Sequence, residues 1–331
     1  MPRVQRHTDG DAKGLITAKL TEDTRSVLRC PKCKSTLNWE LRFVRCSGPC
    51  KSAFPLVDEV PILINESRSI FTIEDCLERR QTTSLAESPI RRVAKRILPP
   101  LGSNPKSRDN YRALGKLLAA IGRPNRVLVI GGRTLGTGMD ILLGNPQVQL
   151  IESDVALGGR TALICDAHDL PFADHSLDAV IAQAVLEHVA DPWRCANEIH
   201  RVLKPSGLVY AETPFMQQVH GGRYDFTRFT ALGHRRLFRQ FDQIDAGSGG
   251  GPGTVLAWSY FYFLRSFARS KRGVDIAAAV ARLTGFWLRY VDFFLVDRPA
   301  AQDGAWGYFF LGRRSDNVLS DRDLIAIYKD L

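Results

Sequence analysis

Residues 164–214 read ICDAHDLPFADHSLDAVIAQAVLEHVADPWRCANEIHRVLKPSGLVYAETP. Two mainly apolar runs in this stretch, 177–183 and 207–213, have the length of buried strands. Between them, residues 192–204 show the apolar spacing of a helix that ends at a Pro-Ser-Gly sequence. A strand, a helix and a second strand in this order form a βαβ unit with parallel strands. The stretch therefore predicts an α/β fold built on a parallel sheet.

The same alternation of strands and helices continues toward the N-terminus. Residues 108–122 have helical spacing, and RVLVIGG at 126–132 is typical of a buried strand that enters a glycine turn. Other strand-like runs lie at 148–153, 162–167 and 306–314. We expect residues 107–315 to form a doubly wound, mostly parallel, seven-stranded sheet, followed by a C-terminal tail at 316–331.

Four of the seven cysteines are clustered near the N-terminus in two close pairs, Cys30 with Cys33 and Cys46 with Cys50. Zinc takes four ligands in tetrahedral geometry, and two such thiolate pairs supply them. We therefore expect residues 26–65 to form a small zinc ribbon whose closed, structural Zn²⁺ site provides much of its folding free energy. The flanking segments are expected to be a disordered tail at 1–25 and a linker at 66–106, with a basic helical segment near 91–98.

The ribbon sequence resembles a known family. CPKCKSTL at 30–37, followed by FPLVDEVPILI at 54–64, is similar to the small zinc-ribbon proteins that activate tRNA and protein methyltransferases. The resemblance covers about 35 residues and implies a ribbon that contacts a methyltransferase domain, here fused in one chain.

The stretch at 164–214 resembles the class I S-adenosylmethionine-dependent methyltransferases of the ubiquinone and menaquinone biosynthesis type. The shared pattern is Asp-Ala before a Leu-Pro-Phe turn, then Leu-Asp, Leu-Glu-His, and a helix that ends at Leu-Lys-Pro. The resemblance implies a Rossmann-like methyltransferase domain in which Asp166 contacts the adenine amine and Ala167 lies beside the ring. It also implies that Gln183 faces the methyl group, while Glu187 and His188 lie at the pocket rim.

The glycine turn VLVIGGRTLGTG at 127–138 is the expected site of backbone approach to the cofactor. An acidic residue at the end of the next strand would hold the ribose hydroxyls, and Asp154 occupies this place, with Glu152 as the alternate. The turn departs from the family because Val129 replaces the usual acidic residue and the glycine spacing is stretched. A domain that keeps the fold and has lost the cofactor is therefore an alternative. The glycines expected to contact the cofactor are Gly131, Gly132 and Gly136.

The loop that follows the last strand of the βαβ unit is the expected substrate side. His220 and Tyr224 in this loop, together with His188, are the candidate catalytic residues, since an imidazole or phenol can take a proton from an acceptor. The structural alternative is a capped helix start, in which Thr230 is the N-cap and Asp225 pairs with Arg228. The segment also resembles, more weakly, methyltransferases of bacterial surface-polysaccharide pathways.

Residues 253–297 are expected to form a helical insertion rich in aromatic residues. One interpretation is a helical hairpin buried against the sheet or in a homodimer. The other is a membrane-surface contact of residues 254–297, which suits a lipid-linked substrate. The basic residues that would face acidic headgroups are Arg265, Arg269, Lys271 and Arg272.

The composition limits the function classes. The formal net charge is +10, which favours anionic partners without choosing among them. The N-terminus lacks an apolar core, so we expect no signal peptide and a cytoplasmic protein, with peripheral contact at the inner face of the membrane as a further option. The sequence thus predicts a methyltransferase that uses S-adenosylmethionine and acts on a small molecule, glycan or lipid-linked acceptor, through O-methylation. The alternatives are an RNA methyltransferase and a non-catalytic adaptor with a methyltransferase fold.

Overall fold

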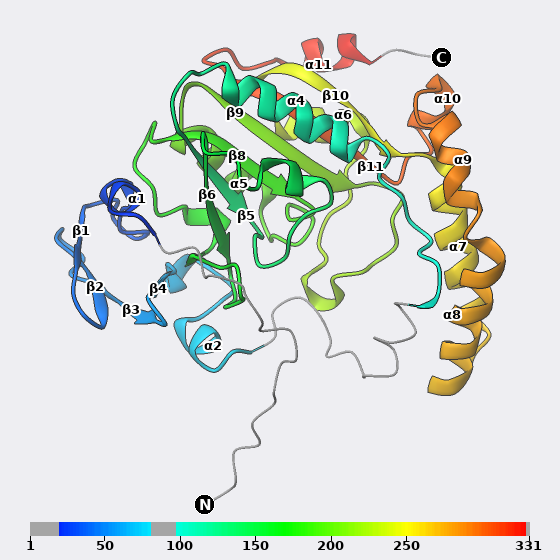
Figure 1. Ribbon diagram of the computed structural model, residues 1–331, viewed down its shortest axis with the longest axis horizontal. Helices are drawn as coiled ribbons and strands as arrows, with labels where there is room; N and C mark the ends of the chain where they lie inside the picture. The colour runs from blue at the N-terminus through cyan, green and yellow to red at the C-terminus, as the bar shows by residue number, and fades with distance from the viewer. Residues whose placement is uncertain (1–19, 81–96, 329–331) are drawn as a thin grey trace, which may run out of the picture.

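A computed structural model describes residues 20–80 and 97–328 of the chain (Figure 1). Most of the predicted tail at 1–25 and most of the basic segment near 91–98 lie outside the described residues. Within the described ranges the strands form one eleven-stranded sheet in the order β1-β2-β3-β4-β7-β6-β5-β8-β9-β11-β10. The predicted doubly wound α/β class is confirmed.

The central part of the sheet comes from residues 107–315, where the sequence predicted seven strands. Strands β4 through β9 in the sheet order are parallel, and β11 and β10 complete the far edge in antiparallel orientation. The seven strands described there are β5 (Asn125–Ile130), β6 (Val148–Asp154), β7 (Leu163–Cys165), β8 (Leu177–Gln183), β9 (Leu203–Pro214), β10 (Phe241–Gly250) and β11 (Gly307–Arg314).

The prediction of a seven-stranded sheet is corrected in one respect, because the ribbon adds its own four described strands to the same sheet. Its last strand pairs with β7 in parallel, with Ile62 opposite Ile164 and Leu63 opposite Cys165. The exposed apolar edge of β7 would otherwise lack a partner, and the run VPILI supplies one. The ribbon strands are β1 (Leu37–Trp39), β2 (Phe43–Cys46), β3 (Ala53–Val57) and β4 (Val60–Leu63).

Helices cover both faces of the central sheet because residues alternate in direction along each strand. Val127, Val129 and Ile181 point to one face, where they pack against α4 (Ser107–Ala119). Leu128, Val180 and their neighbours point to the other face, which α5 (Pro192–Val202) and α6 (Ala231–Leu237) cover. This two-sided burial explains why these strands read as continuous apolar runs.

The segments on either side of the ribbon carry short elements of their own. Helix α1 (Glu22–Val27) begins inside the segment predicted as a tail, and η1 (Glu66–Arg68) and α2 (Ile73–Leu77) lie in the segment predicted as a linker. Beyond β11, α11 (Asp321–Ile327) lies in the predicted C-terminal tail. The other short helical turns are η2 (Met139–Leu142), η3 (Ala167–Asp169) and η4 (Gly222–Tyr224).

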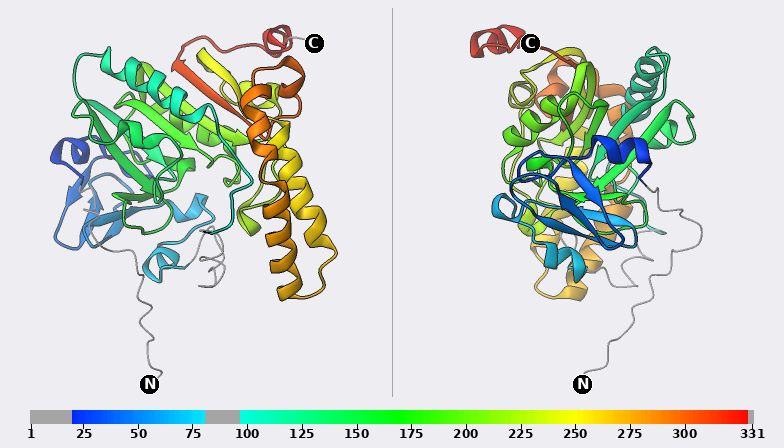
Figure 2. Two further views of the ribbon diagram at one scale, coloured as in Figure 1. Left: turned by 45° about the vertical axis from the view of Figure 1, so that its right-hand side comes forward. Right: turned by 90° about the vertical axis from the view of Figure 1, so that its left-hand side faces the viewer.

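The late aromatic segment forms a helical arm that extends along one side of the molecule (Figure 2). Its helices are α7 (Pro252–Ser266), α8 (Lys271–Gly285), α9 (Leu288–Leu295) and α10 (Pro299–Gln302), and α7 packs against both α8 and α9. The buried carboxylate of Asp292 accepts hydrogen bonds from the backbone N–H groups of Gly253 and Thr254, which fixes α9 to the start of α7. Among the described helices, none has the length and apolar character to cross a bilayer.

Candidate active site and ribbon

A cavity of about 560 Å³ opens at the carboxyl ends of β5 and β8. In doubly wound sheets this edge is where ligands bind, because the connecting loops diverge there. The cavity is lined by the glycine turn, the ends of β8 and β9, and aromatic side chains of α4 and the arm. The lining residues used below are Asn104, Tyr111, Gly131, Gly136, Gln183, Glu212, His220, Trp258 and Trp306.

Two glycines let the turn fold closely over the end of β8. Gly131 has φ +74°, and a Cβ atom there would lie 2.5 Å from Cγ2 of Val185. A Cβ at Gly136 would lie 2.0 Å from Oε1 of Gln183. A side chain at either position would therefore force Val185 or Gln183 to move, although the spacing between the glycines is stretched. Ala184, directly after Gln183, also has a positive φ of 54°, the kind of strained backbone found at ligand sites.

A buried carboxylate that the sequence analysis missed forms the polar end of this cavity. Glu212 at the end of β9 accepts hydrogen bonds from Nε2 of Gln183 at 3.0 Å and from Nδ2 of Asn104 at 2.9 Å. It also accepts one from the hydroxyl of Tyr210. Burial raises the pKa of Glu212, and these hydrogen bonds offset part of that rise. The available signal was its place near the carboxyl end of the strand-like run at 207–213.

The predicted ribose contact lies beside the cavity and is not among its lining residues. The carboxylate of Asp154 accepts hydrogen bonds from the backbone N–H of Arg133 at 3.3 Å and of Ala156 at 3.0 Å. Burial raises the pKa of Asp154, while Arg133 acts in the opposite direction. Gly132 also lies outside the cavity lining, and its N–H donates to the carbonyl of Ser153 at 2.7 Å. The structure therefore brings Gly131, Gly136 and Gln183 together and leaves the other predicted contacts to one side.

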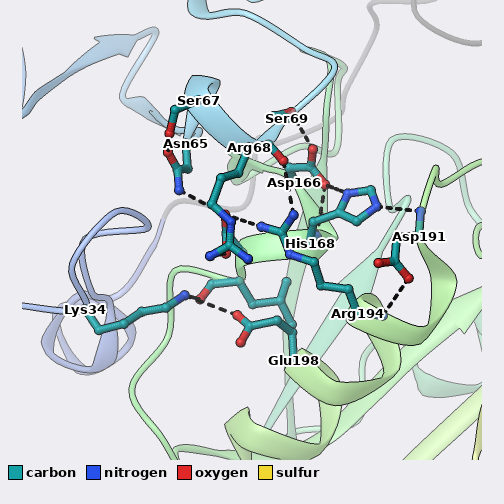
Figure 3. Close-up of polar contacts among 12 residues, drawn as sticks. Lys34, Asn65, Ser67, Arg68, Ser69, Asp166, His168, Asp191, Arg194 and Glu198 are labelled. Carbon is teal, nitrogen blue, oxygen red and sulfur yellow. Dashed lines mark hydrogen bonds and ion pairs between the residues drawn. The ribbon is translucent and has the colours of Figure 1, made fainter.

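The predicted adenine contact, Asp166, is held in a hydrogen-bond network (Figure 3). Its Oδ1 accepts from the backbone N–H of His168 at 3.0 Å and contacts Nδ1 of the same imidazole at 2.5 Å. Its Oδ2 accepts from the hydroxyl of Ser69. Burial raises the pKa of Asp166, but the bonds from His168 outweigh this effect and keep that pKa below its usual range. Ala167, beside it, is buried and is likewise absent from the cavity lining.

Side chains of the ribbon and of the segment after it contact the residues that follow β7 (Figure 3). Nζ of Lys34 donates to the carbonyl of Leu170 and to Oε2 of Glu198, both at 3.1 Å. Nδ2 of Asn65 donates to Oδ2 of Asp169 at 3.0 Å. The segment after β7 is therefore held in place by one side chain from the ribbon and by another from the segment that follows the ribbon.

The four ribbon cysteines fit a tetrahedral zinc ion. The Sγ atom of Cys33 lies 3.3 Å from the Sγ atom of Cys46 and 3.4 Å from that of Cys50. The Sγ atoms of Cys30 and Cys50 are 3.5 Å apart. Zinc–sulfur bonds of about 2.3 Å at tetrahedral angles place the sulfurs about 3.8 Å apart, close to these separations. All four ligands would be protein thiolates, which leaves no position for catalysis.

In the loop expected to lie on the substrate side, the structure brings His220 close to His188. Their rings are 4.8 Å apart, and both Nε2 atoms approach the carboxylate of Glu187, at 3.7 and 3.6 Å. His220 lines the cavity. The phenol ring of Tyr224 instead packs on Phe71, 5.5 Å away between centroids, and lies outside the cavity lining.

The structural alternative for this loop also has support in the contacts. Asp225 pairs with Arg228, and the hydroxyl of Thr230 accepts from the N–H of Gly233 at the start of α6. Asp225 also accepts from the backbone N–H of His220 at 2.7 Å. These contacts fix the loop that carries His220.

Comparison with known proteins gives the class of the central segment. Residues 142–211 match the family model described as a methyltransferase domain. An uncharacterised methyltransferase of Mycobacterium sp. (strain KMS) is 56% identical over 52 residues, which are 16% of this chain and 20% of that protein. Another, from Mycolicibacterium vanbaalenii, is 43% identical over 73 residues, or 22% of this chain and 28% of its own length. The chain therefore carries a methyltransferase-domain segment, as the resemblance predicted, and the matches span less than a third of these relatives.

Solved structures give weaker similarities. A putative sarcosine dimethylglycine methyltransferase from Galdieria sulphuraria is 17% identical with a TM-score of 0.43, covering 63% of this chain and 87% of that one. The complex between the Haloferax volcanii Trm112 methyltransferase activator and a putative methyltransferase gives 19% identity and a TM-score of 0.40, with 63% and 92% covered.

Proposed function

We propose that the protein is an S-adenosylmethionine-dependent methyltransferase with a structural zinc ribbon. The observation that carries this proposal is the cavity of about 560 Å³ in which the glycine turn folds over Gln183. Its volume lies within the roughly 300–1,000 Å³ typical of ligand pockets, and it lies at the sheet edge where such folds bind ligands. The family match over residues 142–211 supports the same reaction class.

The residues around the cavity suit the parts of this ligand. Gly131 and Gly136 would let the backbone approach it. Asp154 and Asp166, which lie outside the cavity lining, would be the acidic hydrogen-bond acceptors for its adenosine end. Val129 stands where the family usually has an acidic residue. The buried carboxylate of Glu212 lines the same cavity and would provide the acidic group in its place. Bound there, S-adenosylmethionine supplies a methyl group already activated by a sulfonium.

The protein's contribution to such a transfer is alignment. A lone pair of the acceptor forms a bond to the methyl carbon while the sulfur–carbon bond breaks and its electron pair returns to sulfur. For an oxygen acceptor the hydroxyl proton must also leave, and His220 and His188 are the candidate groups at this point. We infer O-methylation from the presence of these imidazoles beside the cavity.

A second hollow, next to the main cavity, supports the proposal that the methyl acceptor has an apolar part. It measures about 270 Å³ and shares Gly102, Gln217, His220 and Trp258 with the main cavity. From there it continues along α7 past Phe261 and Tyr262. A glycan or small molecule joined to a lipid would place its polar end near His220 and its chain along the arm.

The surface of the arm fits the same acceptor. The arm carries several exposed large apolar side chains, and exposed apolar patches mark contacts with lipid or protein. Basic residues lie around the turn between α7 and α8, where acidic headgroups would attract them. We propose a peripheral membrane contact through residues 254–297. The most exposed large apolar side chains of the arm are Phe263, Phe267, Ile276, Leu283, Phe293 and Phe294.

Calorimetry with S-adenosylhomocysteine tests the cofactor site directly. Gly136→Ala should weaken binding, because the new Cβ would lie 2.0 Å from Oε1 of Gln183 and would force that cavity-lining side chain to move. Gly115→Ala is the matched control, since its Cβ would make an ordinary contact of 3.5 Å and alanine favours the helix. Asp154→Ala should weaken binding by about 10-fold or more, as expected for loss of a charged hydrogen-bond acceptor. Undetectable binding by the wild type at millimolar ligand would favour the adaptor alternative.

A further inference from the structure

Glu187, His188 and His220 form a compact group of metal-ligand type outside the ribbon. Their ligand atoms, one from each side chain, all lie within 4.8 Å of one another. Glu187 and His188 follow β8, while His220 comes from the loop after β9. The group lies at the cavity through His220, which lines both hollows.

The carboxylate of Glu187 has an unusual environment. The residue is 0% exposed, and neither carboxylate oxygen has a hydrogen-bond partner among the described residues. A buried carboxylate without hydrogen bonds is costly, and native structures normally provide a compensating donor or cation. The polar atoms near it are the two imidazole Nε2 atoms, at 3.6 and 3.7 Å, which is beyond hydrogen-bond distance.

The histidines present their free nitrogens to the same point. Nδ1 of His188 donates to the carbonyl of Tyr224 at 2.7 Å, which directs the other ring nitrogen, Nε2, toward Glu187. Metal-binding histidines are typically held in this way, with the second ring nitrogen bonded to a carbonyl or carboxylate. Gly221 makes room for this ring, because a Cβ there would lie 2.5 Å from it.

We propose that these three residues bind a divalent transition-metal ion of the Zn²⁺ type. Two imidazoles and one carboxylate are a known ligand set for catalytic zinc and for related ions with open positions. Metal–ligand bonds of about 2.0–2.1 Å at tetrahedral angles separate the ligand atoms by about 3.4 Å. The observed separations of 3.6 and 3.7 Å from Glu187 need only a small contraction. The ligand atoms of the two imidazoles lie within 4.8 Å of each other and would also have to approach.

Because His220 lines the cavity, an ion held by this group would be placed to take an oxygen atom of the acceptor at an open position. This part of the inference rests on the proposed methyltransferase function. The ion would polarise the acceptor hydroxyl, whose proton is lost to water before the oxygen forms its bond to the methyl carbon. His220 then acts as a ligand and not as the base. The acceptor class is accordingly a hydroxyl compound that can coordinate a metal ion.

Metal content after equilibrium dialysis tests the site without any activity measurement. Wild-type protein dialysed against micromolar Zn²⁺ should hold about two zinc ions per chain, one in the ribbon and one at the new site. Glu187→Gln and His220→Gln should each hold about one zinc ion. Loss of a hydrogen-bond partner of a metal ligand lowers metal affinity roughly 10–100-fold, and loss of a ligand itself should lower the affinity for the second ion by more than that. His200→Gln, a histidine on α5 outside the group, is the matched control and should keep both ions.

Thermal unfolding of each variant shows whether the fold is intact. His220 retains 31% side-chain exposure, so its replacement should leave the fold unchanged even if Glu187→Gln lowers stability. A wild type that holds one zinc ion, or a His220→Gln variant that keeps two, would overturn the proposal. Binding of S-adenosylhomocysteine is measured separately, so a failed metal site and a failed methyltransferase function give different results.

Discussion

The hydroxyl of Ser69 donates a hydrogen bond to the carboxylate of Asp166, a residue 97 positions later in the chain. Ser69 follows the ribbon, and Asp166 follows β7 and is the predicted adenine contact. The bond therefore joins the N-terminal part of the chain to the candidate cofactor site, next to the pairing of β4 with β7.

Removal of the Ser69 hydroxyl should weaken ligand binding at the candidate cofactor site. Ser69→Ala should weaken binding of S-adenosylhomocysteine about five-fold, because a net hydrogen-bond contribution of about 1 kcal/mol no longer orients Asp166. Calorimetry measures the effect. Ser47→Ala, which removes a hydroxyl bonded to the carbonyl of Thr36 within the ribbon, should leave the affinity unchanged. Equal affinities for both variants would show that Ser69 has no role in the site.

Loss of one ribbon thiolate should destabilise more than the ribbon. Cys33→Ser should remove the ribbon zinc and lower the melting temperature of the whole protein by several degrees, since about 1 kcal/mol corresponds to roughly 2–4 °C in a chain of this size. The reason is that β4 of the ribbon is also a strand of the main sheet. Elemental analysis and thermal unfolding provide the two measurements. Cys76→Ala, a buried cysteine outside the cluster, should keep the zinc, and zinc retention by Cys33→Ser would contradict the ligand assignment.

A buried histidine should make stability depend on pH. Burial lowers the pKa of His234 to about 3, so protonation favours the unfolded chain, where the pKa is about 6.5. Its contribution is fully present above about pH 6.5 and is lost as the pH falls toward 3, at about 1.4 kcal/mol per pH unit. His234→Leu should flatten this slope in urea unfolding between about pH 4 and 7. Leu237→Met, in the same helix, should shift the free energy of unfolding without changing the slope, and an unchanged slope in His234→Leu would count against the assignment.

The basic turn of the arm should control membrane binding. Flotation with acidic liposomes at low salt should recover the wild type with the lipid and lose it as salt rises, since each Lys or Arg near such a surface contributes about 1 kcal/mol. Charge reversal at Arg265, Arg269, Lys271 and Arg272 should abolish binding, while reversal at Lys32 and Arg42 of the ribbon should not. Wild type that stays soluble under these conditions would assign the exposed aromatic residues to a protein contact.

The local sequence signals predicted the sheet well because they are short-range. The βαβ stretch at 164–214, the strand before the glycine turn and the strand at 306–314 all appear as strands and helices in the structure. The pairing of Ile62 with Ile164 could not be predicted in this way, since nothing in VPILI states which strand edge it will join. The ribbon resemblance implied contact with the second domain but not a shared sheet.

In the candidate site, too, the residues given by local sequence signals were predicted and those that depend on long-range pairing were not. Gly131 and Gly136 follow from the glycine turn and Gln183 from the family resemblance, and the three meet in one cavity. Glu212 was missed because its role depends on lying opposite Gln183 in a parallel pair, which is a property of the register. The group of Glu187 with His220 likewise depends on a loop returning across the end of the sheet. Such contacts become visible only when the strands are placed.

The pairing of β4 with β7 also imposes an order on the synthesis of the protein. Ile62 is made about a hundred residues before its partner Ile164, an interval of roughly 5–20 s at common ribosomal rates. All four ribbon cysteines precede Ile62, so the nascent ribbon can take up zinc while one side of its last strand is still unpaired. The supply of metal during translation, and protection of that strand by chaperones until β7 emerges, would then govern the yield of folded protein.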